Sequence, residues 1–121
     1  MYSAQVLDHF QNPRNVGELE NASATVEVAN PACGDVMRLS VRVEDGRVSA
    51  VRFKTAGCVT SIACGSLLTE MIQGRAVSEL AEISHQSISE ALGGLPPATM
   101  HGSQLAADAL RALLAKLKKQ R

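Results

Sequence analysis

The sequence predicts an α+β fold, a small antiparallel sheet with helices packed on one face. Strand-like alternation of apolar and polar residues is confined to the first half of the chain, and helical periodicity dominates the second half. The chain has 121 residues, of which 45% are apolar. A chain of this length buries roughly two-thirds of its unfolded surface. We therefore expect residues 1–121 to form a single domain with its own core.

The chain is expected to begin with a short helix over residues 2–10. Tyr2, Val6 and Phe10 recur at helical spacing, and the polar run that starts with Asn12 and Pro13 ends the pattern. Next, residues 25–29 and 36–43 read as paired strands, because apolar and polar side chains alternate strictly along the second segment.

The turn after the second strand decides the register of the hairpin. A two-residue loop of Asp45 and Gly46 would place Arg52 opposite Leu39 on the apolar face, so a three-residue loop over residues 44–46 is favoured. This loop predicts three pairs: Leu39 with Val51, Met37 with Phe53, and Asp35 with Thr55. It also brings Cys33 and Cys58 to the same end of the hairpin.

The remainder of the chain reads as helical. Thr60 or Ser61 can cap a helix that ends near Gly74. Ser78 and Ser87 mark two shorter helical pieces, the second of which ends at a pair of glycines. A long amphipathic helix follows His101, with leucines along one stripe and lysines in its last turn.

Charge and composition disfavour several kinds of partner. The chain carries 12 basic and 12 acidic residues, so its formal net charge is zero. This balance gives no electrostatic reason to expect nucleic acid or an anionic membrane as a partner. No apolar stretch approaches the roughly 20 residues of a membrane span, and no leader pattern is found, so we expect a cytoplasmic protein. Three cysteines make a poor disulfide framework and are more consistent with free thiols.

Four potential metal ligands lie where a loop meets a helix or a strand: Cys33, Asp35, Cys58 and His101. Two thiolates, an imidazole and a carboxylate can form a ligand set for zinc or iron. Cys58 directly precedes a helix, whose positive end favours thiolate over thiol. None of the four residues forms a CxxC motif, so their spacing alone does not decide whether a metal site is present.

Structural interpretations compete with these assignments. Cys64 shares a helix face with leucines, which favours a core thiol and leaves Cys64 as a reserve ligand. Asp35 can serve simply as the cap of a turn, which the residues alone slightly favour. His9 and His85 lie in polar surroundings and are expected at the surface.

Several longer stretches resemble the IscU/NifU N-terminal family of iron-sulfur cluster assembly scaffolds. They are residues 8–17, 30–37, 53–58 and 66–70, and Leu95-Pro96-Pro97 followed by His101. The resemblance implies an IscU/SufE-like fold with a three-stranded antiparallel sheet, and a carrier rather than an enzyme. It also implies a transient [2Fe-2S] cluster, with zinc or iron possible in the isolated protein. The implied partners are a cysteine desulfurase, Hsp70/Hsp40-type chaperones, a frataxin-like protein and apo iron-sulfur client proteins.

Carried over residue by residue, the resemblance makes Cys33, Cys58 and His101 cluster ligands and Asp35 the carboxylate that keeps the cluster labile. The family's third cysteine, its expected sulfur acceptor, is replaced by Gly102. A lysine typical of the chaperone-recognition motif is replaced by Thr99.

Three functions remain open at this point. The favoured one is a variant scaffold that binds its cluster through Cys33, Cys58, His101 and either Asp35 or Cys64, with Cys58 or Cys33 accepting sulfur. The second is a zinc-binding sulfur acceptor of the SufU type, although the insertion typical of that branch is not found. The third is a partner-binding module without a cluster, which the glycine at position 102 makes possible.

Overall fold

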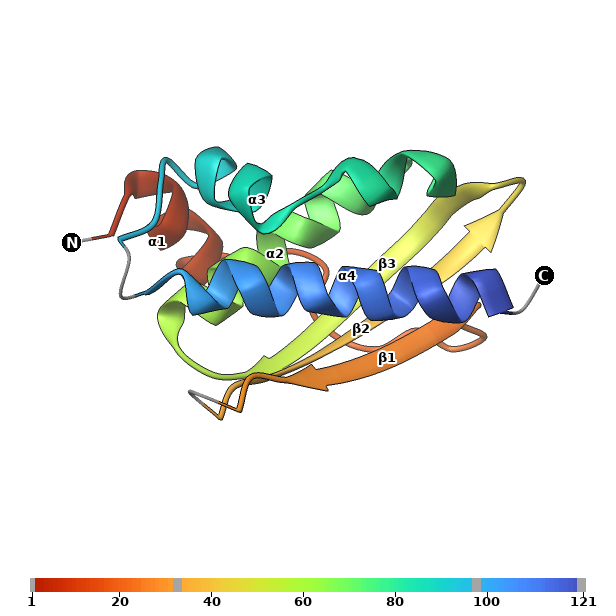
Figure 1. Cartoon of the computed structure of the whole chain (residues 1–121), viewed down its shortest axis with the longest axis horizontal. Coiled ribbons are helices and arrows are strands. Elements are labelled where there is room, and N and C mark those ends of the chain that lie inside the picture. The colour runs from red at the N-terminus through yellow and green to blue at the C-terminus, as the bar shows by residue number, and fades with distance from the viewer. Residues whose placement is uncertain (1, 32–33, 97–98, 120–121) are drawn as a thin grey trace.

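Three antiparallel strands form a sheet in the order β1-β2-β3, and helices cover one of its faces (Figure 1). The computed structural model describes residues 2–31, 34–96 and 99–119. Its elements are α1 (Ala4–Gln11), β1 (Ala24–Ala29), β2 (Val36–Glu44), β3 (Arg47–Ala56), α2 (Val59–Ile72), the 3-10 helix η1 (Val77–Glu82), α3 (His85–Ala91) and α4 (His101–Lys119). This architecture confirms the predicted α+β class.

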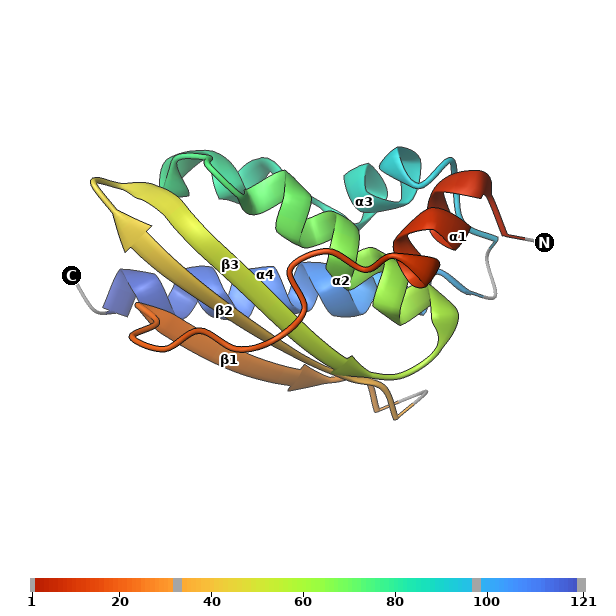
Figure 2. The same ribbon diagram turned by 180° about the vertical axis from the view of Figure 1, so that it is seen from behind.

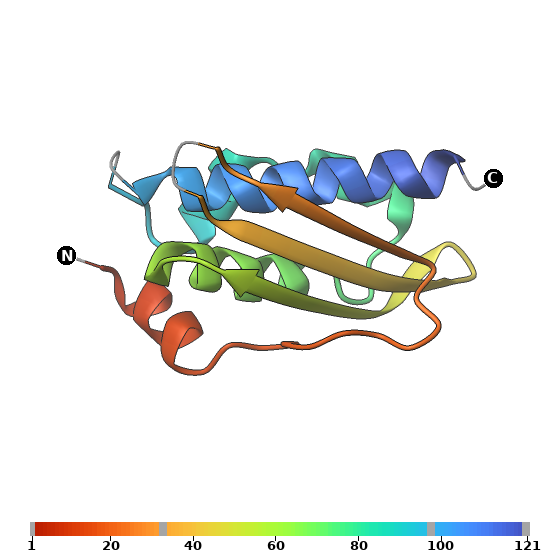
Figure 3. The same ribbon diagram turned by 90° about the horizontal axis from the view of Figure 1, so that it is seen from below.

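The core lies between the sheet and the two longest helices. Helix α4 packs on β1 and β2, while α2 packs on β3 (Figure 3). The alternation predicted for β2 is confirmed at its apolar positions, since Met37, Leu39 and Val41 are fully buried. On the opposite face Arg38 is exposed, but Ser40 is buried beside Thr25. The predicted partner strand is also confirmed, because β1 pairs with β2 in antiparallel orientation.

The hairpin between β2 and β3 corrects the predicted loop and register. Asp45 and Gly46 have φ angles of 53° and 74° and form a two-residue turn, with Glu44 opposite Arg47. A bulge after Arg42 then shifts the register by one residue and keeps apolar side chains on one face. The observed pairs are Leu39 with Phe53, Met37 with Thr55 and Val41 with Val51. The pairs predicted for Leu39, Met37 and Asp35 are therefore wrong by two residues, because the bulge lies within the strand and not in the turn.

Several helix boundaries also differ from the predictions. Helix α2 begins at Val59 with Cys58 as its N-cap, so the predicted caps at Thr60 and Ser61 are wrong. Helix α4 includes His101 as its first residue. None of the helices in the described ranges combines the length and apolarity that a bilayer crossing requires.

The two short helical pieces begin earlier than predicted. Ser84, not Ser87, caps α3, because the Ser87 N–H donates to the Ser84 hydroxyl. The 3-10 helix starts at Val77, one residue before Ser78. The glycine pair after α3 does end that helix, and both glycines have positive φ.

The N-terminal segment is attached to the rest of the fold both through α1 and through the residues that follow it. Helix α1 packs on α2 with Val6 and His9 buried, while Phe10 stays partly exposed. The chain then runs beside β3, where Asn15 accepts a hydrogen bond from the Phe53 N–H and Gly17 donates one to the Phe53 carbonyl (Figure 2). These bonds cover part of the outer edge of β3.

His9 was expected at the surface, and this prediction is wrong. The side chain is buried, with Nδ1 2.7 Å from the Ser66 hydroxyl and Nε2 3.3 Å from a Glu70 carboxylate oxygen. Burial lowers the pKa of His9, the positive charge of Arg14 adds to this effect, and Glu70 opposes it. His85, also expected at the surface, is half-buried. The partners of His9 come from a distant helix, so local sequence does not reveal them.

The low pKa of His9 predicts a loss of stability in mild acid. An unfolded chain has a histidine pKa of about 6.5 and therefore binds the proton first as the pH falls. Above that pH the residue is neutral in both states and contributes no pH dependence. Below this pH, the free energy of unfolding is expected to decrease until the pH passes the pKa of His9 in the folded state. In His9→Gln the free energy of unfolding should fall less over the same pH range. Urea unfolding of both proteins from about pH 7.5 to about pH 5 measures the difference. Parallel pH profiles would contradict this account.

Candidate metal centre

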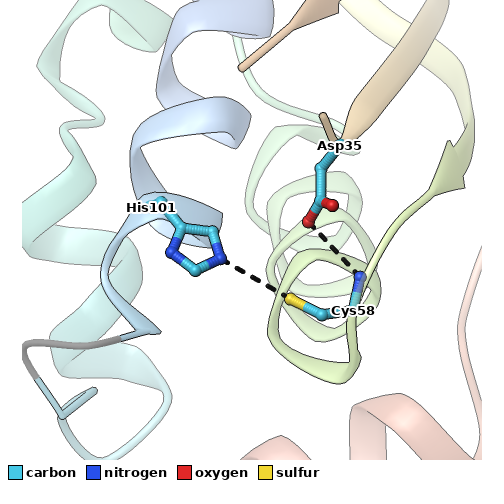
Figure 4. A group of neighbouring side chains, drawn as sticks. All are labelled: Asp35, Cys58 and His101. Atoms are coloured by element: carbon cyan, nitrogen blue, oxygen red, sulfur yellow. Dashed lines mark hydrogen bonds between the residues drawn. The ribbon is translucent and has the colours of Figure 1, made fainter. Parts of the chain in front are cut away.

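Three potential ligands from different parts of the chain converge at one end of the sheet. Asp35 directly precedes β2, Cys58 directly precedes α2, and His101 begins α4. One ligand atom from each of these residues lies within 4.8 Å of the other two. Figure 4 shows the carboxylate and the imidazole both reaching toward Cys58. The structure thus brings together three of the four candidate ligands named from the sequence.

The loop before β2 places Asp35 at this position. The Asn30 N–H donates to the Asp35 carbonyl at 2.8 Å, and the Gly34 N–H donates to the Asn30 carbonyl at the same distance. Gly34 has a φ of 74°, a left-handed conformation that glycine adopts without a steric penalty. The two bonds fix the backbone of Asp35 beside Asn30, and its side chain reaches the start of α2.

The Asp35 carboxylate caps the first turn of α2. Its Oδ2 accepts hydrogen bonds from the Ser61 hydroxyl at 2.5 Å and from the Cys58 N–H at 3.3 Å. The bond from Ser61 lowers the pKa of Asp35 most strongly, bonds from Cys58 lower it further, and burial acts in the opposite direction. Asp35 is therefore a carboxylate at neutral pH, although the residue is only 8% exposed.

Gly57 makes the approach of Asp35 possible. A Cβ atom at Gly57 would lie 2.7 Å from both Cγ and Oδ2 of Asp35, closer than real Cβ contacts. Gly57→Ala is therefore expected to displace the carboxylate from α2 and to reduce the free energy of unfolding by about 1–3 kcal/mol. Urea unfolding measures this loss. A Gly57→Ala protein as stable as the wild type would show that the contact is not tight.

The thiol of Cys58 lies between the first turn of α2 and the imidazole of His101. Cys58 has an extended backbone (φ −79°, ψ 174°), and its side chain makes no capping hydrogen bond. Its Sγ lies 3.6 Å from the Ser61 hydroxyl oxygen and 3.7 Å from His101 Nε2. Since the thiol is exposed, a metal or a sulfur donor can reach it.

Gly102 allows the start of α4 to press against the start of α2. A Cβ at this buried glycine would lie 2.9 Å from Thr60 Cγ2 and 3.2 Å from the Ser61 backbone nitrogen. This close contact brings His101 beside Cys58. The position where the resemblance leads one to expect a third cysteine is thus a close contact between two helices.

The two remaining cysteines differ in what the structure says of them. Cys33 lies outside the described residues, so its predicted role as a ligand stays a prediction. Cys64 is fully buried in the core, and burial raises the pKa of its thiol to about 12. The preferred interpretation of Cys64 as a core thiol is therefore confirmed. Among the described residues, the converging group consists of Asp35, Cys58 and His101, and does not include Cys64.

Cys64→Ala is expected to lower stability without affecting metal binding. Removing a buried sulfur atom is comparable to deleting one or two methylene groups and costs about 1 kcal/mol. Metal uptake should equal that of the wild type, because this buried thiol is not part of the converging group. Denaturant unfolding and metal analysis of the same preparation check both points. Loss of metal uptake would instead make Cys64 a ligand.

Ser61 is the member of this centre that sequence reasoning missed. It was considered only as a helix cap, whereas its hydroxyl connects the carboxylate of Asp35 with the sulfur of Cys58. The available signal was its spacing, since the third residue after an N-cap returns to the same side of the helix.

The chemistry of the group suits a soft or borderline metal. Thiolate and imidazole groups bind zinc and iron well, and a carboxylate is a harder ligand for the same ions. The α+β fold and this group together define a small domain with a candidate metal centre at the end of its sheet. The chain belongs to the NifU-like N-terminal domain family, whose model matches residues 1–121.

Curated relatives support this membership. The chain is 50% identical over 111 residues to the iron-sulfur cluster assembly scaffold protein IscU 1 of Archaeoglobus fulgidus, covering 92% of this chain and 72% of that protein. It is 45% identical over 124 residues to the iron-sulfur cluster assembly scaffold protein IscU of Escherichia coli strain K12, covering 99% of this chain and 96% of that protein.

Solved structures share the fold. The N-terminal part of a nitrogen-fixing NifU-like protein from Brucella abortus matches with a TM-score of 0.80 and 17% identity, covering 98% of this chain and 94% of that chain. FiSufU from the thermophilic Fervidobacterium islandicum AW-1 matches with a TM-score of 0.69 and 20% identity, covering 93% of this chain and 96% of that chain. At these identities the likeness concerns the fold alone.

Proposed function

We propose that this chain is a scaffold on which a [2Fe-2S] cluster is assembled and from which it is transferred to apo-proteins. The convergence of Asp35, Cys58 and His101 from three separate elements carries this proposal. The names of the curated relatives, which are iron-sulfur cluster assembly scaffold proteins, support it. The match of the family model to residues 1–121 supports treating the chain as one scaffold domain.

In this proposal the cluster is cargo, and its ligands are of three chemical types. Cys58 and Cys33 supply thiolates, His101 supplies an imidazole, and Asp35 supplies a carboxylate. Iron-sulfur clusters are most often held by four cysteines. Replacing two thiolates by an imidazole and a carboxylate weakens retention, which suits a protein that must give its cluster away.

A cysteine desulfurase is the proposed source of sulfur. Because Gly102 has no thiol, the acceptor is Cys58 or Cys33. The thiolate attacks the terminal sulfur of the desulfurase persulfide, a new persulfide forms on the scaffold, and the desulfurase cysteine leaves as a thiolate. A frataxin-like protein and Hsp70/Hsp40-type chaperones are further proposed partners. We expect weak chaperone binding, because Thr99 replaces the lysine of the recognition motif.

Anaerobic reconstitution with ferrous iron, a cysteine desulfurase, cysteine and a thiol reductant such as dithiothreitol, which reduces the transferred sulfur to sulfide, tests the function. The full chain is expected to become coloured and to hold about two irons and two sulfides per chain. It should then transfer this cluster to an apo ferredoxin. Cys64→Ala serves as the matched control, because it removes a thiol that lies outside the converging group.

Two other results would point to other functions. A colourless protein that retains one zinc ion and accepts sulfur would favour a zinc-binding sulfur acceptor. The likeness of the fold to FiSufU is compatible with this second function. A protein that binds neither metal nor sulfur would favour a partner-binding module.

A further inference from the structure

The outer face of the sheet is hollowed at the end that carries the metal centre. The helices cover the opposite face, and the segment between α1 and β1 runs beside β3 and crosses the outer face near the turn between β2 and β3 (Figure 3). At the other end, where β2 begins and β3 ends, the described residues form a hollow, here called the outer hollow. Val36 and Ala56 pair there, and they are the sequence neighbours of Asp35 and Gly57. The outer hollow therefore adjoins the candidate metal centre.

Part of the lining of the outer hollow is apolar and open to solvent. Val16 is 53% exposed, more than any other large apolar side chain in the described ranges. Ala56 is exposed as well, and Val36 is half-buried. The exposed surface continues from Ala56 through Gly57 to Cys58. A partner that covers these apolar residues would therefore lie next to the cargo.

The charged side chains that line the rest of the outer hollow are unevenly paired. Arg38 forms ion pairs with both Glu18 and Glu27. Lys54 has no ion pair with any residue that the structure describes, and it lies directly opposite Arg38 on the neighbouring strand. Like charges at directly opposite positions destabilise a sheet. The outer hollow thus offers an unpaired positive charge, although the net charge of the chain is zero.

We propose that the outer hollow is the docking site for an acidic segment of the apo-protein that accepts the cluster. The proposal rests on the proposed function, because it requires that a cluster is transferred. A carboxylate of the acceptor pairs with Lys54, and apolar side chains beside it cover Val16 and Ala56. A second copy of this chain does not fit, because two concave surfaces leave a void between them and a specific interface requires complementary shapes.

A small and charged surface suits the acceptor better than it suits the sulfur donor. Small interfaces are typical of transient encounters, and complementary charges mainly raise the rate at which two proteins associate. The sulfur donor must deliver two sulfur atoms for each [2Fe-2S] cluster, which favours a longer-lived complex. The acceptor binds once and must then leave with the cargo, so weak and fast docking is an advantage to it.

The rate of cluster transfer from the loaded full chain to an acidic apo ferredoxin tests this proposal. Visible circular dichroism follows the transfer. Lys54→Glu is expected to lower the second-order rate constant roughly tenfold at low ionic strength, because the charge that attracts the acceptor is reversed. Added salt should slow the wild type and reduce the difference between the two proteins. In urea unfolding Lys54→Glu should be at least as stable as the wild type, because opposite charges then face each other across β2 and β3.

Lys118→Glu is the matched control. Lys118 is also an exposed lysine, so its reversal changes the net charge of the chain by the same amount. It lies in the last turn of α4, whereas His101 begins that helix at the metal centre. This variant should transfer its cluster at close to the wild-type rate. Val16→Ser removes apolar contact area without changing the charge, and it should also slow transfer.

Three outcomes would overturn the proposal. Equal transfer rates for Lys54→Glu and Lys118→Glu would mean that the acceptor does not use the outer hollow. Slower cluster assembly in Lys54→Glu with unchanged transfer would mean that the sulfur donor docks there instead. Faster loss of the cluster from Lys54→Glu without any acceptor would mean that Lys54 acts on the cargo itself. Failure of the proposed function would appear differently, as a wild-type chain that forms no cluster, and the docking proposal would then fail with it.

Discussion

Cys58→Ser protein is expected to stay colourless after anaerobic reconstitution and to bind Zn²⁺ at least roughly 100-fold more weakly than the wild type. Losing an outer hydrogen bond typically costs 10–100-fold in metal affinity, and the loss of a direct ligand should cost at least as much. A serine hydroxyl remains protonated at neutral pH, whereas the metal requires a deprotonated thiolate. Competition with a chelator of known affinity measures the zinc effect, and visible absorbance measures the cluster.

This substitution preserves the size and the fold of the site. Cys58 is the N-cap of α2, and serine is a favourable residue at that position, so the variant should be at least as stable as the wild type. If the variant is stable but no longer binds metal, the loss is therefore due to the missing ligand and not to unfolding. Wild-type zinc affinity in Cys58→Ser would contradict the assignment of Cys58.

Gly102→Cys is the second variant with a large expected effect. It introduces a thiol at the position where the family resemblance leads one to expect a cysteine, yet it should destabilise this chain. The new Cβ would lie within 3.2 Å of the first turn of α2, and overpacking of this kind typically costs 1–3 kcal/mol. We also expect weaker zinc binding, because the start of α4 must move and carries His101 away from Cys58.

Gly102→Ala separates the steric effect from the added thiol. It places the same Cβ against Thr60 and Ser61 without a sulfur atom. Both variants should lose similar stability in urea unfolding, and their zinc affinities should both fall. If Gly102→Ala equals the wild type in stability, the close contact between α2 and α4 is not tight. If Gly102→Cys binds zinc more strongly than the wild type does, the new thiol joins the site.

Local patterns in the sequence predicted the sheet but not its register. The alternation along β2 identified the buried face, because side chains of a strand alternate between two sides. The three-residue loop was wrong because a bulge beside Arg42 keeps the apolar face continuous as effectively as a bulge in the turn would. Apolar patterning constrains which face each residue occupies, and registers two residues apart satisfy it equally.

Local patterns in the sequence also predicted part of the candidate site. Asp35, Cys58 and His101 stood out because each lies where a loop meets an element, and the antiparallel pairing of β2 with β3 brings the first two of these junctions together. The bond from Ser61 to Asp35 and the contact of His9 with Ser66 join residues far apart in the chain, so local periodicity does not reveal these partners. The close contact at Gly102 is likewise a property of two packed helices.

X-ray absorption at the zinc edge tests most directly whether these side chains share one metal. Zinc-loaded wild type should show sulfur at roughly 2.3 Å and lighter atoms at roughly 2.0–2.1 Å, including an imidazole. His101→Ala should lose the imidazole signature and keep the sulfur neighbours, while Cys58→Ser should lose one of its sulfur neighbours. An imidazole signal that survives His101→Ala, or a zinc ion without any sulfur neighbour in the wild type, would contradict the account.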